Sequence, residues 1–328
     1  MASNRITPQD FLAQNGFEGV RLTPIPADAS GRRYFRFEDV AGQLLILMDA
    51  PPTANLKTDV FLTVTTHLAD ARLSVPKVSK QDLTQGYLVL TDLGNMTASD
   101  HLKVNPCEEL KVYLAVLQTL HQIEPIHIPG LAHLDPKTAG DMVRIAAVEY
   151  ADRSDVTLQI SDLMRSYFEA FCDPNLKLAL RDFHAENIIW RPEQQGIDRV
   201  GLIDYQDAFF APAGYDLVSL IRDVRRDVSK STQNELINRY MDRSGSGPEF
   251  RLQLHCLAIQ RNLRVLGVFA RLVRRLNKPK YANFLGRVWR LLLEDLQPVE
   301  FQELRGLIMG NFPEPDESLM QSWQGLQA

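Results

Sequence analysis

Two short polar segments of this 328-residue chain carry residue types that suit proton and metal chemistry. Asp182 and Asn187 lie in the first segment, with four residues between them, and Asp204 lies in the second. Transfer of a phosphoryl group needs a carboxylate that accepts a hydroxyl proton, together with oxygen ligands for Mg²⁺. Asp182 can accept the proton, while Asn187 and Asp204 can hold the metal. These residues therefore indicate phosphoryl transfer as the candidate chemistry.

Short apolar runs stand next to both segments and predict the strands that position them. The runs are 176–180 before the first segment, 200–203 before the second, and 188–190 between them. Each run is too short for a helix and has polar flanks, which is typical of small strands that support loops. The residue types alone also allow a structural role, because Asp and Asn shape turns. In that case Asp204 would cap a helix or pair with Arg181.

The N-terminal part of the chain predicts a small sheet. Residues 33–38 alternate between apolar and polar types, and 43–48 form a short apolar run after a turn, which together predict a hairpin. A further strand is predicted at 87–90, and helical spacing of apolar residues predicts a helix at 59–72. The polar break at 91–94 then separates this part from the rest of the chain.

Helices are predicted over most of the remaining chain. A short N-terminal helix is also expected after Thr7, since Pro8 takes the first helical position. The fold class is therefore α+β, with a sheet-rich lobe at 1–91 and a mostly helical lobe at 92–328. The predicted helices of the second lobe are 108–123, 138–151, 160–172, 215–226, 231–243, 249–275, 279–294 and 298–308.

The overall composition excludes several classes of protein. Hydrophobic residues make up 45% and charged residues 23%, near the globular average, and the net charge is −5. This acidic balance argues against a nucleic-acid-binding or membrane-surface protein. No uninterrupted apolar stretch is long enough to predict a membrane span or a signal peptide. Three widely spaced cysteines predict neither a disulfide framework nor a zinc site.

A turn rich in small residues precedes the predicted hairpin. It includes Ser30 and Gly31 and continues into Arg32 and Arg33. Small residues allow backbone N–H groups to approach a phosphate. The chain contains neither a Walker loop nor a G-x-G-x-x-G sequence, so the turn is either a phosphate-binding loop of another kind or an ordinary lead-in to the hairpin.

Several motifs resemble those of the aminoglycoside phosphotransferase family, relatives of the protein kinases. The family motifs are Arg181–Asn187, Leu202–Tyr205 and Tyr215–Leu217. Other segments resemble one branch of that family, the bacterial kinases of cell-wall amino sugars. These segments are Ser30–Arg36, Leu47–Pro52, Leu90–Gly94, Ile203–Ala208 and Gln260–Gly267.

The resemblance implies a protein-kinase-like fold of two lobes, a small antiparallel sheet followed by a mostly helical lobe. It also implies a reaction, in which the γ-phosphoryl group of ATP moves to the anomeric hydroxyl of N-acetylmuramate or N-acetylglucosamine during cell-wall recycling. Asp182 would then be the catalytic base, and Asn187 and Asp204 would hold Mg²⁺. Asp216 would brace the catalytic loop. The nucleotide would contact Ser30, Gly31, Arg32 and Arg33 at its phosphates, and the hinge residues Leu90, Asp92 and Gly94 at adenine.

Two departures from the kinase pattern stand out. Leu180 occupies the position, two residues before the base, where relatives commonly have His, and the strand at 44–48 lacks the phosphate-binding Lys. Lys57 lies nearby in sequence but beyond that strand. Arg32 or Arg33 is our candidate to meet the phosphate charge, because a guanidinium suits phosphate oxygens. The alternative is that both arginines are solvated.

Further polar residues are candidates for the substrate side of the site: His184, Glu186, Asp207 and Arg261. For His184 we expect a structural role, because phosphoryl transfer needs only one base, while Glu186 can face substrate or solvent. Arg261 shares a predicted helix face with Arg264, Arg271 and Arg275, which is either a surface for an anionic substrate or a partner, or a solvated face. The lactyl carboxylate of N-acetylmuramate is one anion that such a surface can reach. Three aromatic residues can stack on a sugar or pack in the core: Trp190, Tyr205 and Trp289.

Three functions fit these residues. The first is an amino-sugar kinase that uses ATP and Mg²⁺ in the cytoplasm, with no obligate protein, nucleic-acid or membrane partner. The second is a kinase for an aminoglycoside, choline or fructosamine-type acceptor, against which the arginines of 261–275 argue. The third is a catalytically inactive regulator that binds a nucleotide or a sugar, which the missing strand lysine favours.

Overall fold

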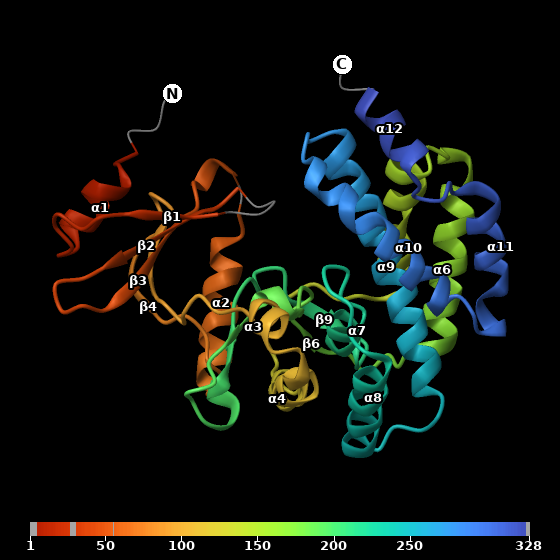
Figure 1. Cartoon of the computed structure of the whole chain (residues 1–328), viewed down its shortest axis with the longest axis horizontal. Helices are drawn as coiled ribbons and strands as arrows, with labels where there is room; N and C mark the ends of the chain where they lie inside the picture. Colours follow the sequence, from red (N-terminus) through yellow and green to blue (C-terminus); the bar gives the residue numbers. More distant parts are fainter. Residues whose placement is uncertain (1–4, 27–30, 55, 326–328) are drawn as a thin grey trace. The chain divides into compact units, whose positions relative to one another are not determined.

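The computed structural model describes residues 5–26, 31–54 and 56–325. The chain divides into two compact units, which are coloured along the sequence in Figure 1. The first comprises Met1–Glu108 and Glu186–Asp207, and the second comprises Glu109–Ala185 and Ala208–Ala328. These units reflect packing alone, and the division into functional lobes at 1–91 and 92–328 stays a prediction.

A five-stranded antiparallel sheet is the main element of the first unit. Its strand order is β1-β2-β3-β5-β4. The predicted hairpin is confirmed, since β2 and β3 pair along their whole lengths. The strands are β1 (Thr23–Ile25), β2 (Arg33–Glu38), β3 (Leu44–Asp49), β4 (Val78–Asp82) and β5 (Tyr87–Thr91). Sequence patterns missed β1, which has only three residues and contains Pro24, and β4, whose polar edge sequence shows no apolar alternation.

The α-helices in the described part of the first unit are α1 (Pro8–Gln14), α2 (Thr58–Asp70) and α3 (Ala98–Val104). The predicted start of α1 is confirmed, because the Thr7 side chain accepts a hydrogen bond from the Asp10 backbone in a capping box. Phe11 of α1 stacks on Tyr87 of β5 with ring centroids 5.0 Å apart. This helix therefore covers one face of the sheet with a hydrophobic cluster.

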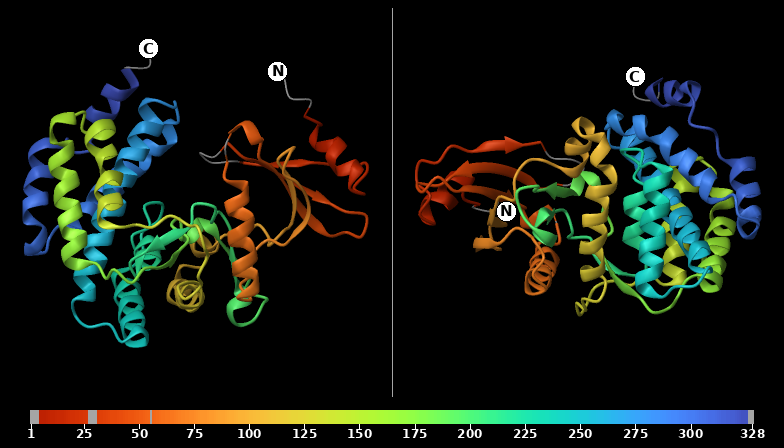
Figure 2. Two further views of the ribbon diagram at one scale, coloured as in Figure 1. Left: turned by 180° about the vertical axis from the view of Figure 1, so that it is seen from behind. Right: turned by 60° about the horizontal axis from the view of Figure 1, so that its bottom comes forward.

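Helices make up most of the second unit, as predicted. The long helix α9 packs against α5, α6, α7 and α10, and buries residues on all its faces. Figure 2 shows this helix group from two further sides. The helices are α4 (Glu109–Ile123), α5 (Pro136–Ile145), α6 (Thr157–Phe171), α7 (Tyr215–Ile221), α8 (Lys230–Ser244), α9 (Phe250–Arg274), α10 (Ala282–Asp295), α11 (Gln302–Asn311) and α12 (Glu317–Gly325).

The helix predicted at 215–226 is too long, because α7 ends at Ile221. The Asp223 carboxylate accepts a hydrogen bond of 2.8 Å from the Arg225 backbone N–H. Such a local side-chain bond offers the backbone an alternative to the helix and ends it.

The helix predicted at 138–151 also changes character, since α5 stops at Ile145 and Ala146–Tyr150 form a π-helical turn. Helix α9 approaches the backbone closely at that point. A Cβ added to Gly267 would lie 2.5 Å from the Ile145 carbonyl carbon.

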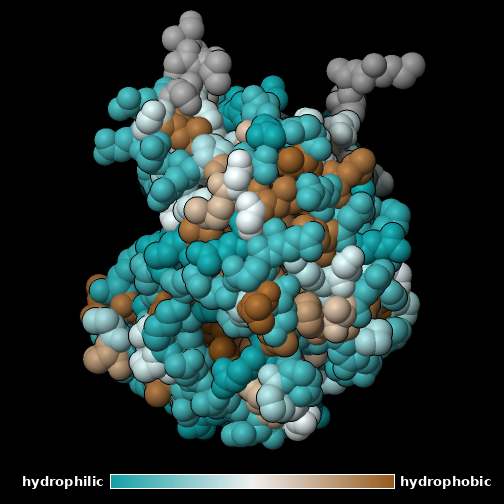
Figure 3. Space-filling view, turned by 90° about the vertical axis from the view of Figure 1, so that its right-hand side faces the viewer, coloured by the Kyte–Doolittle hydropathy of each residue, from teal (hydrophilic) through white to brown (hydrophobic). Residues whose placement is uncertain are grey.

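Side chains on the face drawn in Figure 3 are mainly hydrophilic, with hydrophobic ones in small groups between them. Among the described helices, none combines the length and the apolar character needed to cross a membrane.

Candidate active site

The loop that carries Asp182 is anchored within the second unit by a small sheet and by α7. β6 (Lys177–Ala179) pairs antiparallel with β9 (Phe209–Ala211), so the strand predicted at 176–180 is confirmed. The two carboxylate oxygens of Asp216 accept hydrogen bonds from the backbone N–H groups of Leu180, at 2.6 Å, and Arg181, at 3.0 Å. This geometry fits the bracing role predicted for Asp216.

The buried Asp216 carboxyl is electrostatically unusual. Burial raises its pKa to about 7, although the two backbone N–H groups act in the opposite direction. Its first-turn position on α7 also favours a negative charge. From the same helix, the Ser219 hydroxyl donates to the Arg181 carbonyl at 3.0 Å. The loop before Asp182 is therefore held at both its N–H and its carbonyl groups.

Two candidate-site residues adopt the left-handed backbone conformation, Arg181 with φ 77° and Asp204 with φ 61°. A non-glycine residue in this region stores about 1–3 kcal/mol of strain. Such strain persists only where the surroundings fix the backbone, as the bonds from Asp216 and Ser219 do at Arg181. The backbone directly before Asp182 is therefore held in one conformation.

The two predicted metal ligands lie together within the first unit. β7 (Ile188–Trp190) pairs antiparallel with β8 (Val200–Leu202), which confirms both predicted strands. Asn187 precedes β7 and Asp204 follows β8, so the pairing brings them to the same end of this small sheet. The Asn187 amide nitrogen lies 3.5 Å from an Asp204 carboxylate oxygen. The Gln206 amide donates to the other carboxylate oxygen at 2.9 Å.

An amide beside one carboxylate suits a magnesium ion that also binds substrate phosphates. Mg²⁺ commonly uses one or two protein carboxylates and takes its other ligands from phosphate and water. Within the described ranges, no group of three or more His, Cys, Asp or Glu side chains is arranged to hold a metal. The donor set of Asn187 and Asp204 thus fits a metal delivered with a nucleotide better than a permanently bound ion.

Arg32 is a buried cation near the metal-ligand pair of the first unit. Its side chain is 3% exposed and donates to the Leu56 carbonyl, while its Nε has no hydrogen-bond partner among the described residues. The pKa of Tyr34 is raised to about 12, mainly by burial. The charge of Arg32 lowers this pKa, and the charge of Asp204 raises it. Arg32, Tyr34 and Asp204 are therefore electrostatic neighbours. The solvated alternative is wrong for Arg32.

Arg33 has a different environment from Arg32. Its guanidinium donates to the Asp49 carboxylate at the end of β3, which also pairs with Arg5. Arg33 thus shares one carboxylate with Arg5 and is 60% exposed, which agrees with the solvated alternative for this residue. Arg32 is therefore the better candidate for a phosphate ligand. Gly31 is exposed, and Ser30 lies outside the described residues.

The predicted hinge follows β5 and is shaped by Asp92. The Asp92 carboxylate pairs with Arg36 and accepts a 2.9 Å hydrogen bond from the Gly94 N–H. Gly94 has φ 114°, which glycine adopts without strain. Leu90 is buried in β5. The contact of this segment with adenine stays a prediction.

The remaining polar candidates have mixed environments. His184 is buried, and its Nε2 lies 2.8 Å from an Arg225 guanidinium nitrogen. Burial lowers the pKa of His184, and Arg225 and Arg261 lower it further, so the ring is neutral. This suits the structural role that we expected. Asp207 accepts a 2.7 Å bond from Lys57, and Glu186 is partly exposed.

Burial distinguishes between the alternatives given for the arginine row and for the three aromatic residues. Arg261 is 4% exposed, so the solvated-face alternative is wrong for this residue, whereas Arg271 is exposed. The core-packing alternative agrees with the burial of the three aromatic residues, Trp190, Tyr205 and Trp289. Tyr205 also stacks on Phe61 and bonds the Thr65 hydroxyl at 2.9 Å.

Sequence reasoning missed polar residues beside the candidates of each unit: Tyr34 and Gln206 in the first unit, and Arg225 in the second. Gln206 lies two residues after Asp204 in the segment Ile203–Ala208, and this closeness in sequence could have identified it. Tyr34 looked like a strand residue, and Arg225 was assigned to a helix. The contacts of Tyr34 and Arg225 join segments that are distant in sequence, which local patterns do not contain.

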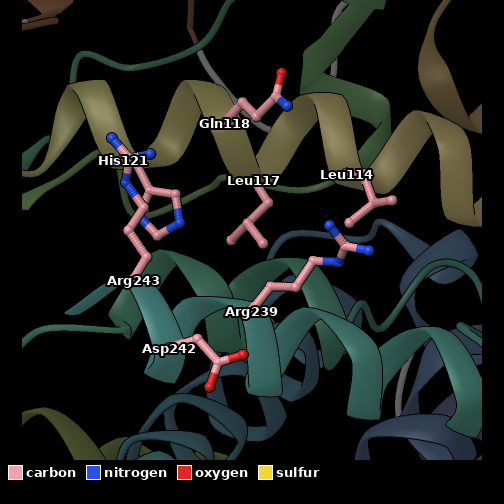
Figure 4. A pocket seen from close by; sticks show the side chains of 7 residues that line it. All are labelled: Leu114, Leu117, Gln118, His121, Arg239, Asp242 and Arg243. Carbon is pink, nitrogen blue, oxygen red and sulfur yellow. The ribbon is translucent and has the colours of Figure 1, made fainter. Parts of the chain in front are cut away.

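A pocket of about 470 Å³ lies elsewhere in the second unit, between α4 and α8. Figure 4 shows His121 from α4 and the two arginines Arg239 and Arg243 from α8 pointing into it. The pocket shares no lining residue with the candidate site.

The chain is similar to known proteins along most of its length. Residues 21–253 match the model of the phosphotransferase enzyme family. The chain is 31% identical to the N-acetylmuramate/N-acetylglucosamine kinase of Caulobacter vibrioides, over 85% of this chain and 88% of that protein. It is 29% identical to the protein of the same name from Pseudomonas aeruginosa, over 87% of each chain.

The chain belongs to the phosphotransferase enzyme family. This confirms the resemblance found in its motifs. Among solved structures, an aminoglycoside phosphotransferase in complex with ADP and hygromycin B matches with a TM-score of 0.62 at 16% identity, over 90% of this chain and 100% of that one. An amicoumacin kinase in complex with AMP-PNP and Ca²⁺ matches with a TM-score of 0.64 at 14% identity, over 92% and 98%. These likenesses confirm the predicted α+β, protein-kinase-like fold.

Proposed function

We propose that this phosphotransferase is an ATP-dependent kinase that phosphorylates the anomeric hydroxyl of N-acetylmuramate or N-acetylglucosamine. The observation that carries the proposal is the combination of a braced Asp182 loop with relatives of that name along most of the chain. The need for ATP also leads us to expect that the reaction takes place in the cytoplasm.

In the proposed reaction, the acceptor hydroxyl oxygen forms a bond to the γ-phosphorus of ATP. The bond from that phosphorus to the bridging oxygen breaks, which leaves ADP. Asp182 takes the hydroxyl proton and orients the oxygen for in-line attack. The backbone bonds to Asp216 keep the Asp182 loop in place during this step.

Asn187 and Asp204 would hold Mg²⁺, which supplies positive charge to the phosphate oxygens. Arg32 would meet the remaining phosphate charge in place of the missing β3 lysine. Its burial and its unpaired Nε support this role. Gln206 would fix the Asp204 carboxylate through its 2.9 Å hydrogen bond.

The absence of a lysine from β3 favours one alternative, a regulator that binds a nucleotide or a sugar without phosphate transfer. A second alternative is a kinase with another acceptor. Release of ADP should be measured with N-acetylmuramate, N-acetylglucosamine, kanamycin and choline as separate acceptors. We expect release with the two amino sugars. Release only with kanamycin or choline would establish another acceptor, and ATP binding without release would favour the regulator.

A further inference from the structure

Two arginines of α9 lack the carboxylate partners that buried arginines normally have. Arg261 is 4% exposed and its Nη1 has no hydrogen-bond partner among the described residues. Arg264 is half-buried, and in the described part of the chain neither residue forms an ion pair. Other arginines of this unit are paired, such as Arg222 with Asp295 and Arg226 with Glu109. A buried guanidinium without a counter-ion is costly, so this pair calls for an explanation.

The two guanidiniums stand close to the predicted base. Burial lowers the pKa of Arg264, Arg181 lowers it further, and Tyr215 and Asp182 raise it. Burial raises the pKa of Tyr215, whereas Arg261, Arg181 and Arg264 lower it. Each of these groups therefore senses the others across a short distance. All five belong to the second unit, so this cluster is complete within one compact body.

The arginines outnumber the acids in this cluster. Three arginines act on Tyr215, and Asp182 is the carboxylate that acts on both Tyr215 and Arg264. Asp223 is a further acid that senses Arg261, but burial raises its pKa and so favours its neutral form. Asp216, which accepts hydrogen bonds from Leu180 and Arg181, is turned to the backbone. Like charges held together raise the free energy of the protein unless an anion joins them. The cluster is thus suited to an anionic ligand beside Asp182.

The helix also sets the geometry of the pair. Arg261 and Arg264 are three residues apart on α9, so they lie on one face with Cβ atoms about 5–6 Å apart. Two guanidiniums at that spacing can bind the two oxygens of one carboxylate. The helix itself is fixed at Gly267, where its backbone meets that of Ile145 and Ala146.

We propose that Arg261 and Arg264 form a carboxylate-binding site for an acidic acceptor. This inference rests on the proposed function, whose two sugars differ in one relevant group. N-acetylmuramate carries a lactyl group, with its carboxylate, in ether linkage to a ring carbon. N-acetylglucosamine has only a hydroxyl at that ring carbon. The arginine pair binds that carboxylate and orients the acidic sugar, while the neutral sugar is bound without it.

The test compares the two sugars in one variant. Arg264→Gln keeps a polar side chain at a half-buried position and should fold. We expect its kcat/KM for N-acetylmuramate to fall about 10- to 100-fold, as for a lost hydrogen bond to a charged group. Its kcat/KM for N-acetylglucosamine should stay within about twofold of the wild-type value, since the neutral sugar lacks the carboxylate. Arg264→Lys should restore part of the loss.

Arg271→Gln is the matched control, because Arg271 is an exposed arginine of the same helix. It should leave both sugars unaffected. An equal loss for both sugars in Arg264→Gln would overturn the proposal, since it would show that Arg264 acts on catalysis and not on the carboxylate. No loss for either sugar would overturn it as well.

A binding measurement separates this proposal from the proposed function. Calorimetry with AMP-PNP and each sugar requires no turnover. If the wild type phosphorylates neither sugar, the proposed function fails, yet weaker binding of N-acetylmuramate to Arg264→Gln would still support the carboxylate site. Wild-type protein that binds N-acetylglucosamine but not N-acetylmuramate would overturn it.

Discussion

Asp182 and the candidate metal ligands are positioned by different sets of contacts. The Asp182 loop is held by Asp216 and Ser219 within the second unit. Asn187 and Asp204 are brought together by β7 and β8 within the first unit. Each group is thus set by its own unit before any ligand binds. Phosphoryl transfer depends on such preorganisation, because enzymes accelerate this reaction mainly by positioning the reactants and by stabilising charge.

Replacement of Asp182 by Asn should remove the base and leave the nucleotide contacts intact. We expect kcat to fall by about 100-fold or more, the range in which a general base contributes. Calorimetric affinity for ATP should not change. Asp162→Asn, at an exposed acid on α6, is the matched control. Wild-type turnover in Asp182→Asn would contradict the role given to this carboxylate.

The adjacent arginines at the start of β2 provide a second comparison. Arg32→Gln should raise the KM for ATP about 10- to 100-fold, because a buried cation that binds phosphate is lost. Arg33→Gln should leave the KM for ATP within about twofold of the wild-type value, since Arg33 is largely exposed and already pairs with Asp49. Steady-state kinetics with varied ATP distinguish the two variants. Equal KM values in both would show that Arg32 does not bind phosphate.

At the scale of elements, α9 links packing to the candidate site. It contacts α5, α6, α7 and α10, and it carries Arg261 and Arg264. Its position depends on Gly267, where the helix backbone meets the π-helical turn after α5. A larger residue there must push the two backbones apart, and neither can move cheaply because Gly267 and Ala146 are both buried.

Gly267→Ala should therefore destabilise the protein. Its Cβ would lie 2.5 Å from the Ile145 carbonyl carbon and 2.6 Å from the Ala146 nitrogen. We expect the free energy of unfolding in urea to fall by about 1–3 kcal/mol, the range for overpacking.

Gly286→Ala in α10 is the matched control, because nothing lies within 4 Å of its added Cβ. It should be neutral or stabilise the protein by up to about 1 kcal/mol, as alanine favours the helix. Equal effects of the two substitutions would contradict the close approach at Gly267.

His121, which lines the pocket between α4 and α8, should make the stability of the protein depend on pH. Burial, and then Arg243, lower the pKa of His121 from 6.5 to about 4. At a pH between these two pKa values, His121 is protonated in the unfolded chain but not in the folded protein. The folded state therefore loses stability as the pH falls through this range. Urea unfolding of His121→Gln should show a weaker decrease between pH 6.5 and 4.5 than the wild type. Parallel curves would show that His121 has an ordinary pKa.

At the scale of the whole molecule, the patterns that could be predicted were local ones. Alternation identified the β2–β3 hairpin, and helical spacing identified α2 and α9 within a few residues. Burial of Arg32 and Arg261 could not be predicted, because it depends on segments that are far away in sequence. The end of α7 was missed for a similar reason, since it is set by one side-chain bond from Asp223.

The same limit applied to the candidate site. The order of Asp182, Asn187 and Asp204 and the strands beside them suggested a shared chemistry from sequence alone. The pairing of β7 with β8 explains why two of these residues meet. The sequence showed Arg261 and Arg264 only as members of a row of arginines on one helix. It could not distinguish the buried members of that row from the exposed ones.

The product of the reaction provides the most direct test of the central claim. Wild-type protein should be incubated with ATP, Mg²⁺ and N-acetylglucosamine, and in parallel with its methyl glycoside, whose anomeric oxygen carries no proton. We expect a sugar 1-phosphate in the ³¹P spectrum of the first reaction and no phosphorylated sugar in the second. Phosphorylation of the methyl glycoside, or of neither sugar while ATP binds, would contradict the central claim.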